Sequence, residues 1–148
     1  MTRVYVDTNI FLYAIGTDHR YRAPCRELVR AMGDHTLRAE TSVETVQEIV
    51  HHRRRRGDPA ATERGRRALG LCEAVHPLDT ETTLAALDLI DLHPDLSTRD
   101  AMHAATARTL GIRILLSADS DFDAIGGLER IDPLDRAALG RATTRRRA

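Results

Sequence analysis

Four acidic residues stand at positions where a carboxylate is unusual, and together they predict a site for a divalent cation. Asp7 and Asp119 each follow a short apolar run that is typical of a buried strand. Glu48 and Asp100 lie on stretches with the composition and spacing of helices. Oxygen ligands without nearby cysteine or clustered histidine favour Mg²⁺ or Mn²⁺ over zinc. One such ion, or a pair, could activate water and offset charge on the leaving oxygen of a phosphodiester.

Each of these carboxylates also has an ordinary structural interpretation. Asp is common in the turns that follow strands. A carboxylate at the start of a helix, such as Asp100, is stabilised by the helix dipole by about 0.3–1 kcal/mol. Glu48 could lie on a solvated helix face. The metal-site prediction therefore depends on all four carboxylates meeting in the folded chain.

The segments that must position these acids alternate between short apolar runs and longer amphipathic stretches. We expect strands at Val4–Val6, Thr36–Thr41, Ala74–Leu78, Ile112–Leu116 and Leu128–Ile131. We expect helices at Ile10–Ile15, Tyr21–Met32, Ser42–Arg56, Ala60–Cys72, Thr80–Ile90 and Arg99–Leu110. This alternation predicts an α/β fold with a parallel sheet covered on both faces. Ligands of such sheets bind outside the carboxyl ends of the strands, where Asp7 and Asp119 are expected.

Length and composition exclude several classes of protein. The 148 residues predict a single domain, at residues 1–140, followed by a loose basic tail at residues 141–148. Zero net charge excludes a uniformly basic nucleic-acid binder, and the absence of lysine excludes P-loop nucleotidases and Schiff-base enzymes. Two separate cysteines, Cys25 and Cys72, make neither a disulfide framework nor a zinc site. No signal-like or membrane-spanning apolar run occurs, so we expect a cytoplasmic protein without membrane contact.

Four segments of the chain resemble the motifs of PIN-domain proteins and follow the family's order. They are Val4–Ile10, Ser42–Glu48, Arg99–Ala105 and Leu115–Phe122. They span nearly the whole chain, whose length is similar to that of VapC-type toxins, the ribonucleases of bacterial toxin–antitoxin pairs. The resemblance implies a three-layer α/β/α sandwich around a mostly parallel sheet of four to five strands. It also implies a Mg²⁺- or Mn²⁺-dependent endoribonuclease toxin whose substrate is RNA, often tRNA or rRNA.

The resemblance also implies roles for individual residues. Asp7 and Asp100 would be the main metal ligands, and Glu48 and Asp119 would complete the acidic catalytic site directly or through water. The residues with supporting roles would be Asp121, with Asp123 left open as an alternative, Thr8 and Asn9. The last two would hold the loop around Asp7 by side-chain hydrogen bonds.

Clustered arginines are candidate contacts for RNA phosphates. They are Arg53, Arg54, Arg55, Arg56, Arg64 and Arg67. Guanidinium groups pair well with phosphates, although a solvated helix surface balanced by nearby acids explains the same pattern. With two Phe, three Tyr and no Trp, side chains for base stacking are scarce, which favours recognition of RNA shape and backbone.

The resemblance to VapC-type toxins further implies protein partners. Such toxins form homodimers and are blocked by a cognate antitoxin, here a VapB-like protein. An extended or helical antitoxin segment needs a groove on the toxin. The amphipathic early helices offer one through Leu12, Tyr13, Leu28 and Val29.

Other functions share some of these features. A non-catalytic PIN-like RNA-binding or scaffold domain would keep the fold and the arginines without binding a metal. A haloacid-dehalogenase-like phosphatase also has Asp after its first strand, but it needs a second Asp where this chain has Asn9, and a lysine. Dinucleotide binding is excluded because no GxGxxG follows the first strand. His103 is a candidate general base, but we favour a packing role on its alanine-rich helix.

Overall fold

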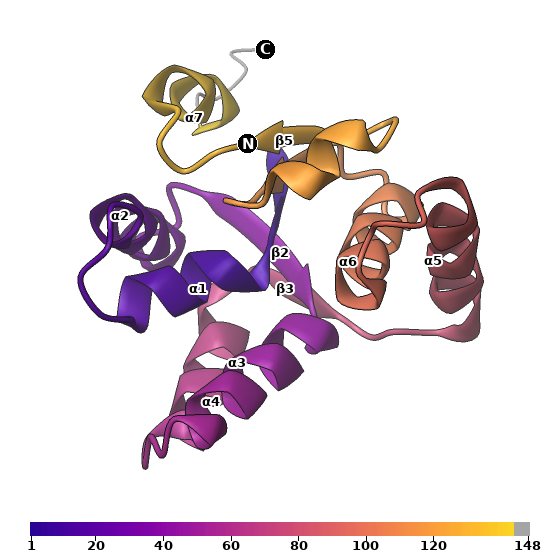
Figure 1. Ribbon diagram of the computed structural model, residues 1–148. Helices are drawn as coiled ribbons and strands as arrows, with labels where there is room; N and C mark the ends of the chain where they lie inside the picture. The colour runs from indigo at the N-terminus through magenta and orange to yellow at the C-terminus, as the bar shows by residue number, and fades with distance from the viewer. Residues whose placement is uncertain (144–148) are drawn as a thin grey trace.

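Five parallel strands form the centre of the molecule, and the computed structural model describes residues 1–143 (Figure 1). The strands are β1 (Arg3–Val6), β2 (Arg38–Ser42), β3 (Ala74–His76), β4 (Ile114–Leu116) and β5 (Glu129–Ile131). Their order across the sheet is β3-β2-β1-β4-β5, so β1 is central. All four pairings are parallel, with Val6 beside Leu116 at the carboxyl ends of β1 and β4. This confirms the predicted parallel sheet.

Helices connect the strands and cover both faces of the sheet. They are α1 (Thr8–Ile15), α2 (Arg22–Gly33), α3 (Val43–Arg55), α4 (Ala61–Leu71), α5 (Thr80–Leu92), α6 (Thr98–Thr109) and α7 (Arg136–Thr143), with a 3-10 turn, η1, at Ser120–Ala124. Figure 1 shows α1 and α2 on one side of the sheet and α5 and α6 on the other. The predicted three-layer α/β/α sandwich is therefore confirmed.

Each face of the sheet has its own apolar core, and β1 contributes to both. Val4 and Val6 pack with apolar residues of α1, α2, α3, α4 and α7. Tyr5, between them in the strand, packs on the opposite face with α5, α6 and η1. Successive residues of a strand point to opposite faces, so a run of three buried residues is what a central strand requires. Packing on both faces therefore fixes β1 relative to its neighbours β2 and β4, the strands that lead to Glu48 and Asp119.

The second strand is confirmed although it carries two charged residues. Glu40 is 3% exposed, and both of its oxygens bind the Arg3 guanidinium, at 2.6 and 2.9 Å. Nε2 of His76 lies 2.7 Å from the same carboxylate. The Arg3 hydrogen bonds outweigh the effect of burial and, with His76, lower the Glu40 pKa to about 2. The charge is thus buried with partners from β1 and β3, which local hydrophobicity cannot reveal.

The ends of the chain and of several elements differ from expectation. β4 begins at Ile114 rather than Ile112, because the Ile112 amide donates to the Ala107 carbonyl and closes the end of α6. Residues 141–143, predicted as the start of the tail, form the last turn of α7, and residues 144–148 lie outside the described part. Within residues 1–143, no helix has the length and hydropathy needed to cross a membrane.

Candidate active site at the carboxyl edge of the sheet

The predicted acids come from four elements that converge at one edge of the sheet. Asp7 follows β1, and Asp119 comes three residues after the end of β4, the neighbouring strand. Asp100 lies in the first turn of α6, whose N-cap Ser97 accepts a hydrogen bond from the Asp100 amide at 3.1 Å. Glu48 lies on α3, which follows β2. Because adjacent parallel strands end side by side, the topology itself brings the first two acids together.

Three carboxylates lie close enough together to hold one cation between them. Asp100, Asp119 and Asp121 each offer an oxygen, and these atoms all lie within 4.8 Å of one another. Burial, followed by the negative charges of Asp7 and Asp119, raises the Asp100 pKa to about 7. Burial and neighbouring acids disfavour the ionised form of such a carboxyl group, and a bound cation would stabilise that ionised form. The oxygen-only donor set suits Mg²⁺ or Mn²⁺.

Asp7 is held rigidly beside this cluster. It is 4% exposed; its Oδ2 accepts from Ser117 Oγ at 2.6 Å and Asn9 Nδ2 at 3.1 Å, and its Oδ1 accepts from the Thr8 amide at 2.7 Å. Burial raises its pKa despite these hydrogen bonds. Asn9 thus contacts Asp7 through its side chain, whereas Thr8 contacts Asp7 through its backbone amide and places its hydroxyl 3.4 Å from both Thr45 Oγ1 and His103 Nε2. The Ser117 hydroxyl, which no motif of the sequence singles out, also accepts from the Asp119 amide at 3.0 Å and so links the Asp7 carboxylate to the Asp119 backbone.

Glu48 is connected to Asp7 through His103 and lies outside the three-carboxylate cluster. Nε2 of His103 lies 2.8 Å from Glu48 and 3.6 Å from Asp7, and its Nδ1 lies 2.7 Å from the Tyr5 hydroxyl. Burial lowers the pKa of this fully buried imidazole, but Tyr5 and the carboxylates of Glu48 and Asp7 raise it well above the usual value. With both ring nitrogens occupied inside the protein, His103 orients Glu48, in agreement with a packing role.

The crowded acids after β4 take different positions. Asp119 caps η1 by accepting from the Asp121 amide at 2.9 Å. Asp121 belongs to the cluster, although its side chain is exposed. Asp123 instead pairs with Arg130 at 2.7 and 3.2 Å. The structure therefore brings Asp121, and not Asp123, to the acidic site.

The six candidate arginines are dispersed over several surfaces. Arg53 and Arg64 both donate to Asp58 at 2.7 Å, which joins the end of α3 to α4 and lowers the Asp58 pKa. Arg64 and Arg67 line a groove beside α1 and α2, away from the acids. Arg54 lines a separate hollow along α3. The six arginines therefore do not all line one hollow.

Two of the six arginines do lie next to the acidic site. Arg55 and Arg56, together with Arg99 and the carboxylate Glu48, line a hollow of about 510 Å³. Within residues 1–143 none of these three guanidinium groups makes an ion pair or side-chain hydrogen bond. Unpaired guanidinium groups beside carboxylates suit a phosphate backbone bridged to a metal ion. Arg99 was not singled out from the sequence, although it directly precedes Asp100.

Comparison with known proteins agrees with this geometry. The PIN domain family model matches residues 4–128. The chain is 36% identical to Ribonuclease VapC7 of Mycobacterium tuberculosis (strain ATCC 25618 / H37Rv) over 132 residues, covering 88% of this chain and 91% of the relative. It is 29% identical to Ribonuclease VapC23 of the same strain over 116 residues, covering 78% and 92%.

Solved structures share the fold. Mycobacterium tuberculosis VapC20, described as a sarcin-ricin loop cleaving toxin, superposes with a TM-score of 0.69 at 21% identity, covering 83% of this chain and 95% of the other. A toxin–antitoxin complex from Klebsiella pneumoniae gives a TM-score of 0.66 at 19% identity, covering 88% and 97%. With a family match over most of its length and a relative of 36% identity, this chain belongs to the PIN-domain family, among the VapC ribonucleases.

Proposed function

We propose that this protein is the toxin of a toxin–antitoxin pair and a Mg²⁺- or Mn²⁺-dependent endoribonuclease. The observation that carries the proposal is the meeting of Asp100, Asp119 and Asp121 within 4.8 Å, beside the buried Asp7. These residues supply only oxygen donors, and the raised Asp100 pKa is consistent with a site completed by positive charge. A bound ion would supply an activated water and stabilise charge on the leaving oxygen.

The residues of the chain have separable roles in this proposal. Asp7, Asp100 and Asp119 hold the cation, with Asp121 as an auxiliary ligand. Ser117 binds the Asp7 carboxylate and the backbone amide of Asp119, so that it holds one ligand oxygen and the loop that carries the other ligand. Glu48, held by His103 through Nε2, lines the arginine-lined hollow, where its carboxylate would accept a proton or a hydrogen bond from a metal-bound water.

The proposed substrate is RNA, and structured RNA such as tRNA or rRNA is the class we expect. The hollow next to Glu48 carries three unpaired guanidinium groups, those of Arg55, Arg56 and Arg99, which suit consecutive phosphates. We propose that the protein works in the cytoplasm as a homodimer. One relative in solved structures is described as cleaving the sarcin-ricin loop, which makes a ribosomal RNA loop one substrate to test.

Metal removal tests the enzyme proposal. We expect EDTA to abolish cleavage of total RNA by the purified protein, and Mn²⁺ or Mg²⁺ to restore it. In the EDTA-treated protein, Mn²⁺ at about 100 times its Kd should stabilise the fold by about 2.7 kcal/mol, which raises the melting temperature by roughly 5–10 °C. Asp7→Asn protein, purified identically, should show no cleavage and so exclude a contaminating nuclease. Cleavage that persists in EDTA would contradict the proposal, as would a melting temperature that saturating metal leaves unchanged.

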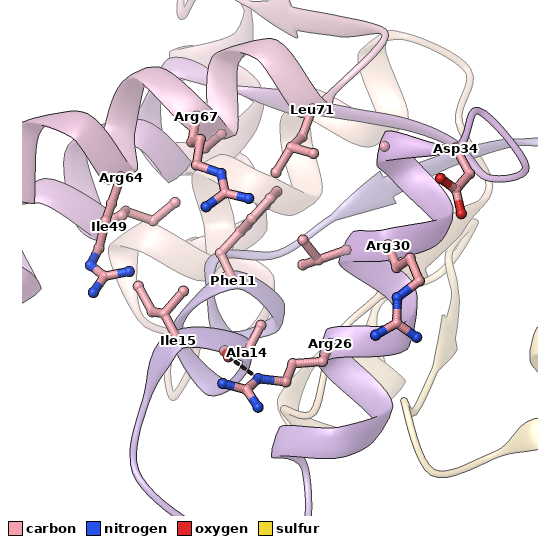
Figure 2. A pocket seen from close by; sticks show the side chains of 13 residues that line it. Phe11, Ala14, Ile15, Arg26, Arg30, Asp34, Ile49, Arg64, Arg67 and Leu71 are labelled. Atoms are coloured by element: carbon pink, nitrogen blue, oxygen red, sulfur yellow. Dashed lines mark hydrogen bonds between the residues drawn. The ribbon is translucent and has the colours of Figure 1, made fainter.

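A groove between α1, α2, α3 and α4 is the proposed antitoxin site. Its volume is about 750 Å³, and its apolar floor includes Phe11, Ile15 and Val29. Figure 2 shows four arginines around this floor: Arg26, Arg30, Arg64 and Arg67. Apolar anchors within a basic rim suit an amphipathic segment that carries acidic residues.

Only one of the four residues predicted to form the antitoxin groove lines it. Val29 lines it, but Leu28 is buried in the core. Leu12 and Tyr13 line a different hollow, on the side of α1 nearer the acidic site. A short amphipathic helix such as α1 has two apolar sides, and the sequence does not say which one stays uncovered.

Charge reversal in the groove tests the antitoxin site. We expect Arg67→Glu to weaken binding of the cognate VapB-like antitoxin by at least about tenfold, because a like charge would then face its acidic residues. Arg66→Glu is the matched control, since Arg66 lies on the same helix but its side chain is 70% exposed and its contact is Glu63. Equal affinity of the two variants, measured by calorimetry, would contradict this site.

A further inference from the structure

The hollow that Leu12 and Tyr13 line lies beside the acidic site, and because aromatic rings line it we name it the aromatic hollow. Its volume is about 560 Å³, and it lies between α1, the turn that follows α1, and the last part of α3. Tyr13 and His19 contribute the rings, and His52, Arg53 and Arg56 contribute nitrogen-bearing groups. The proposed metal chemistry and the antitoxin groove leave the ring-lined part of this hollow, at Tyr13 and His19, without a role.

The rings form a small stacked cluster. The ring centroids of Tyr13 and His19 are 4.7 Å apart with an interplanar angle of 21°, and His19 also stacks with Tyr21 at 5.7 Å and 13°. The Tyr21 amide donates to Nδ1 of His19 at 3.2 Å, which fixes the orientation of the exposed imidazole. Aromatic side chains are scarce in the sequence as a whole, but two of the three tyrosines meet here. The few aromatic side chains of the protein are therefore partly gathered on this face.

The aromatic hollow is continuous with the acidic site. Asn9 lines it and also donates to Asp7 at 3.1 Å. It shares His52 and Arg56 with the hollow that contains Glu48. Glu48 and His52, like Asn9 and Tyr13, are one helical turn apart, about 6 Å along the helix axis. A chain bound at the acids would therefore pass directly into the aromatic hollow.

The charges around the hollow suit a nucleic acid. Arg56 has no carboxylate partner within residues 1–143, and Arg53 is the only guanidinium group in the lining that does, through Asp58. Among residues 1–143, no acidic side chain lines the hollow. Nδ1 of His52 is buried without a hydrogen-bond partner in the described part of the chain. A ring platform, an unpaired guanidinium group and an unsatisfied ring nitrogen together match the base and phosphate of one nucleotide.

We propose that this hollow, defined by Tyr13, His19, His52 and Arg56, binds one unpaired nucleotide adjacent to the cleaved bond. The base stacks on His19 and Tyr13, and Arg56 binds the adjoining phosphate. Because a base in a duplex is already stacked and paired, the site selects single-stranded loops and ends over helices. The inference rests on the proposed ribonuclease function and adds to it the strand state of the substrate next to the cut.

Binding measured without metal separates this inference from catalysis. The probe is a fluorescein-labelled single-stranded RNA of mixed sequence, compared with the same strand in a duplex, and fluorescence anisotropy in EDTA gives the affinity. We expect His19→Ala to weaken single-stranded binding by roughly 5- to 100-fold and to leave duplex binding unchanged. His19→Tyr should retain the wild-type affinity, since it keeps a ring at that place. His93→Ala, which removes an imidazole at the end of α5, is the matched control.

Several results would overturn the inference. Unchanged single-stranded affinity in both His19→Ala and Tyr13→Ala, with melting temperatures close to wild type, would show that no base binds there. Equal weakening for single strand and duplex would show a contact to the backbone alone. Weaker antitoxin binding with unchanged RNA affinity would assign the hollow to the protein partner. If the wild-type protein shows no metal-dependent cleavage while His19 still controls single-stranded affinity, the proposed catalysis fails and the nucleotide site stands.

Discussion

Asp100→Asn is expected to reduce RNA cleavage by about a thousandfold or more, while the protein remains folded. Asp100 belongs to the three-carboxylate cluster, and the charge of Asp7 also raises its pKa. Its loss therefore removes a ligand at the centre of the proposed site. A metal ion contributes several kcal/mol to the stabilisation of charge in such reactions, and each 1.36 kcal/mol is a factor of ten in rate. The amide keeps the shape of the side chain but provides a weaker, neutral oxygen.

The same substitution should not destabilise the metal-free protein. The Asp100 pKa rises to about 7, from a value near 3.8, because of burial and the neighbouring carboxylates. A carboxyl group with a raised folded-state pKa favours unfolding progressively as pH rises from about 4 to 7. Asparagine carries no charge, so at pH 7.5 the variant without metal should be at least as stable as wild type in urea unfolding.

Asp123→Asn is the matched control for Asp100→Asn. It makes the same chemical change nearby, but Asp123 pairs with Arg130 and lies outside the cluster. Rates should be measured by gel analysis of RNA cleavage at saturating Mg²⁺. Wild-type cleavage by the Asp100→Asn protein would remove this residue from the site, and loss of activity in both variants would point to a general structural effect.

The sequence was sufficient to predict that acids would meet at one edge of a parallel sheet. Asp7 and Asp119 follow recognisable strands, and the rule that ligands bind at the carboxyl ends of strands applies whatever the strand order. That β1 and β4 are neighbours is a property of the folded sheet and has no local signal. It is nevertheless this pairing that brings Ser117 to Asp7, 110 residues apart in the chain.

Other details of the site depend on contacts that a single sequence does not encode locally. Asp121 and Asp123 differ in role because one of them finds Arg130 on β5. The arginine run reads as one basic patch, yet Asp58 fixes Arg53, while Arg56 remains unpaired within the described residues. Side-chain direction on a helix and the presence of a distant partner decide these outcomes, and both are set by tertiary packing.

Glu40→Ala is expected to lower the free energy of unfolding at pH 7 by about 3 kcal/mol, and the melting temperature by roughly 6–12 °C. The Glu40 carboxylate binds Arg3 through both oxygens and His76 through one, so it joins β1, β2 and β3. Arg3 also donates to the Leu110 carbonyl at 2.9 Å, which extends the network to the end of α6. Removal of Glu40 leaves Arg3 without its charge partner. The expected loss lies at the low end of the losses measured when one partner of a buried ion pair is removed, because the Arg3 side chain is 36% exposed and regains some hydration.

The pH dependence of the stability loss in Glu40→Ala distinguishes a contribution of the Glu40 charge from a contribution of packing alone. The Arg3 hydrogen bonds, together with His76, lower the Glu40 pKa to about 2 from an unperturbed value near 4.5. The resulting stabilisation is complete above about pH 4.5 and is lost as pH falls toward 2, so the difference between wild type and Glu40→Ala should narrow across a urea series from pH 7 to pH 3. Glu73→Ala is the control, because Glu73 binds Arg38 at 3.0 Å with its side chain 52% exposed and should cost less than about 1 kcal/mol. A Glu40→Ala protein as stable as Glu73→Ala, or a deficit that does not change with pH, would mean that the buried charge does not hold these three strands together.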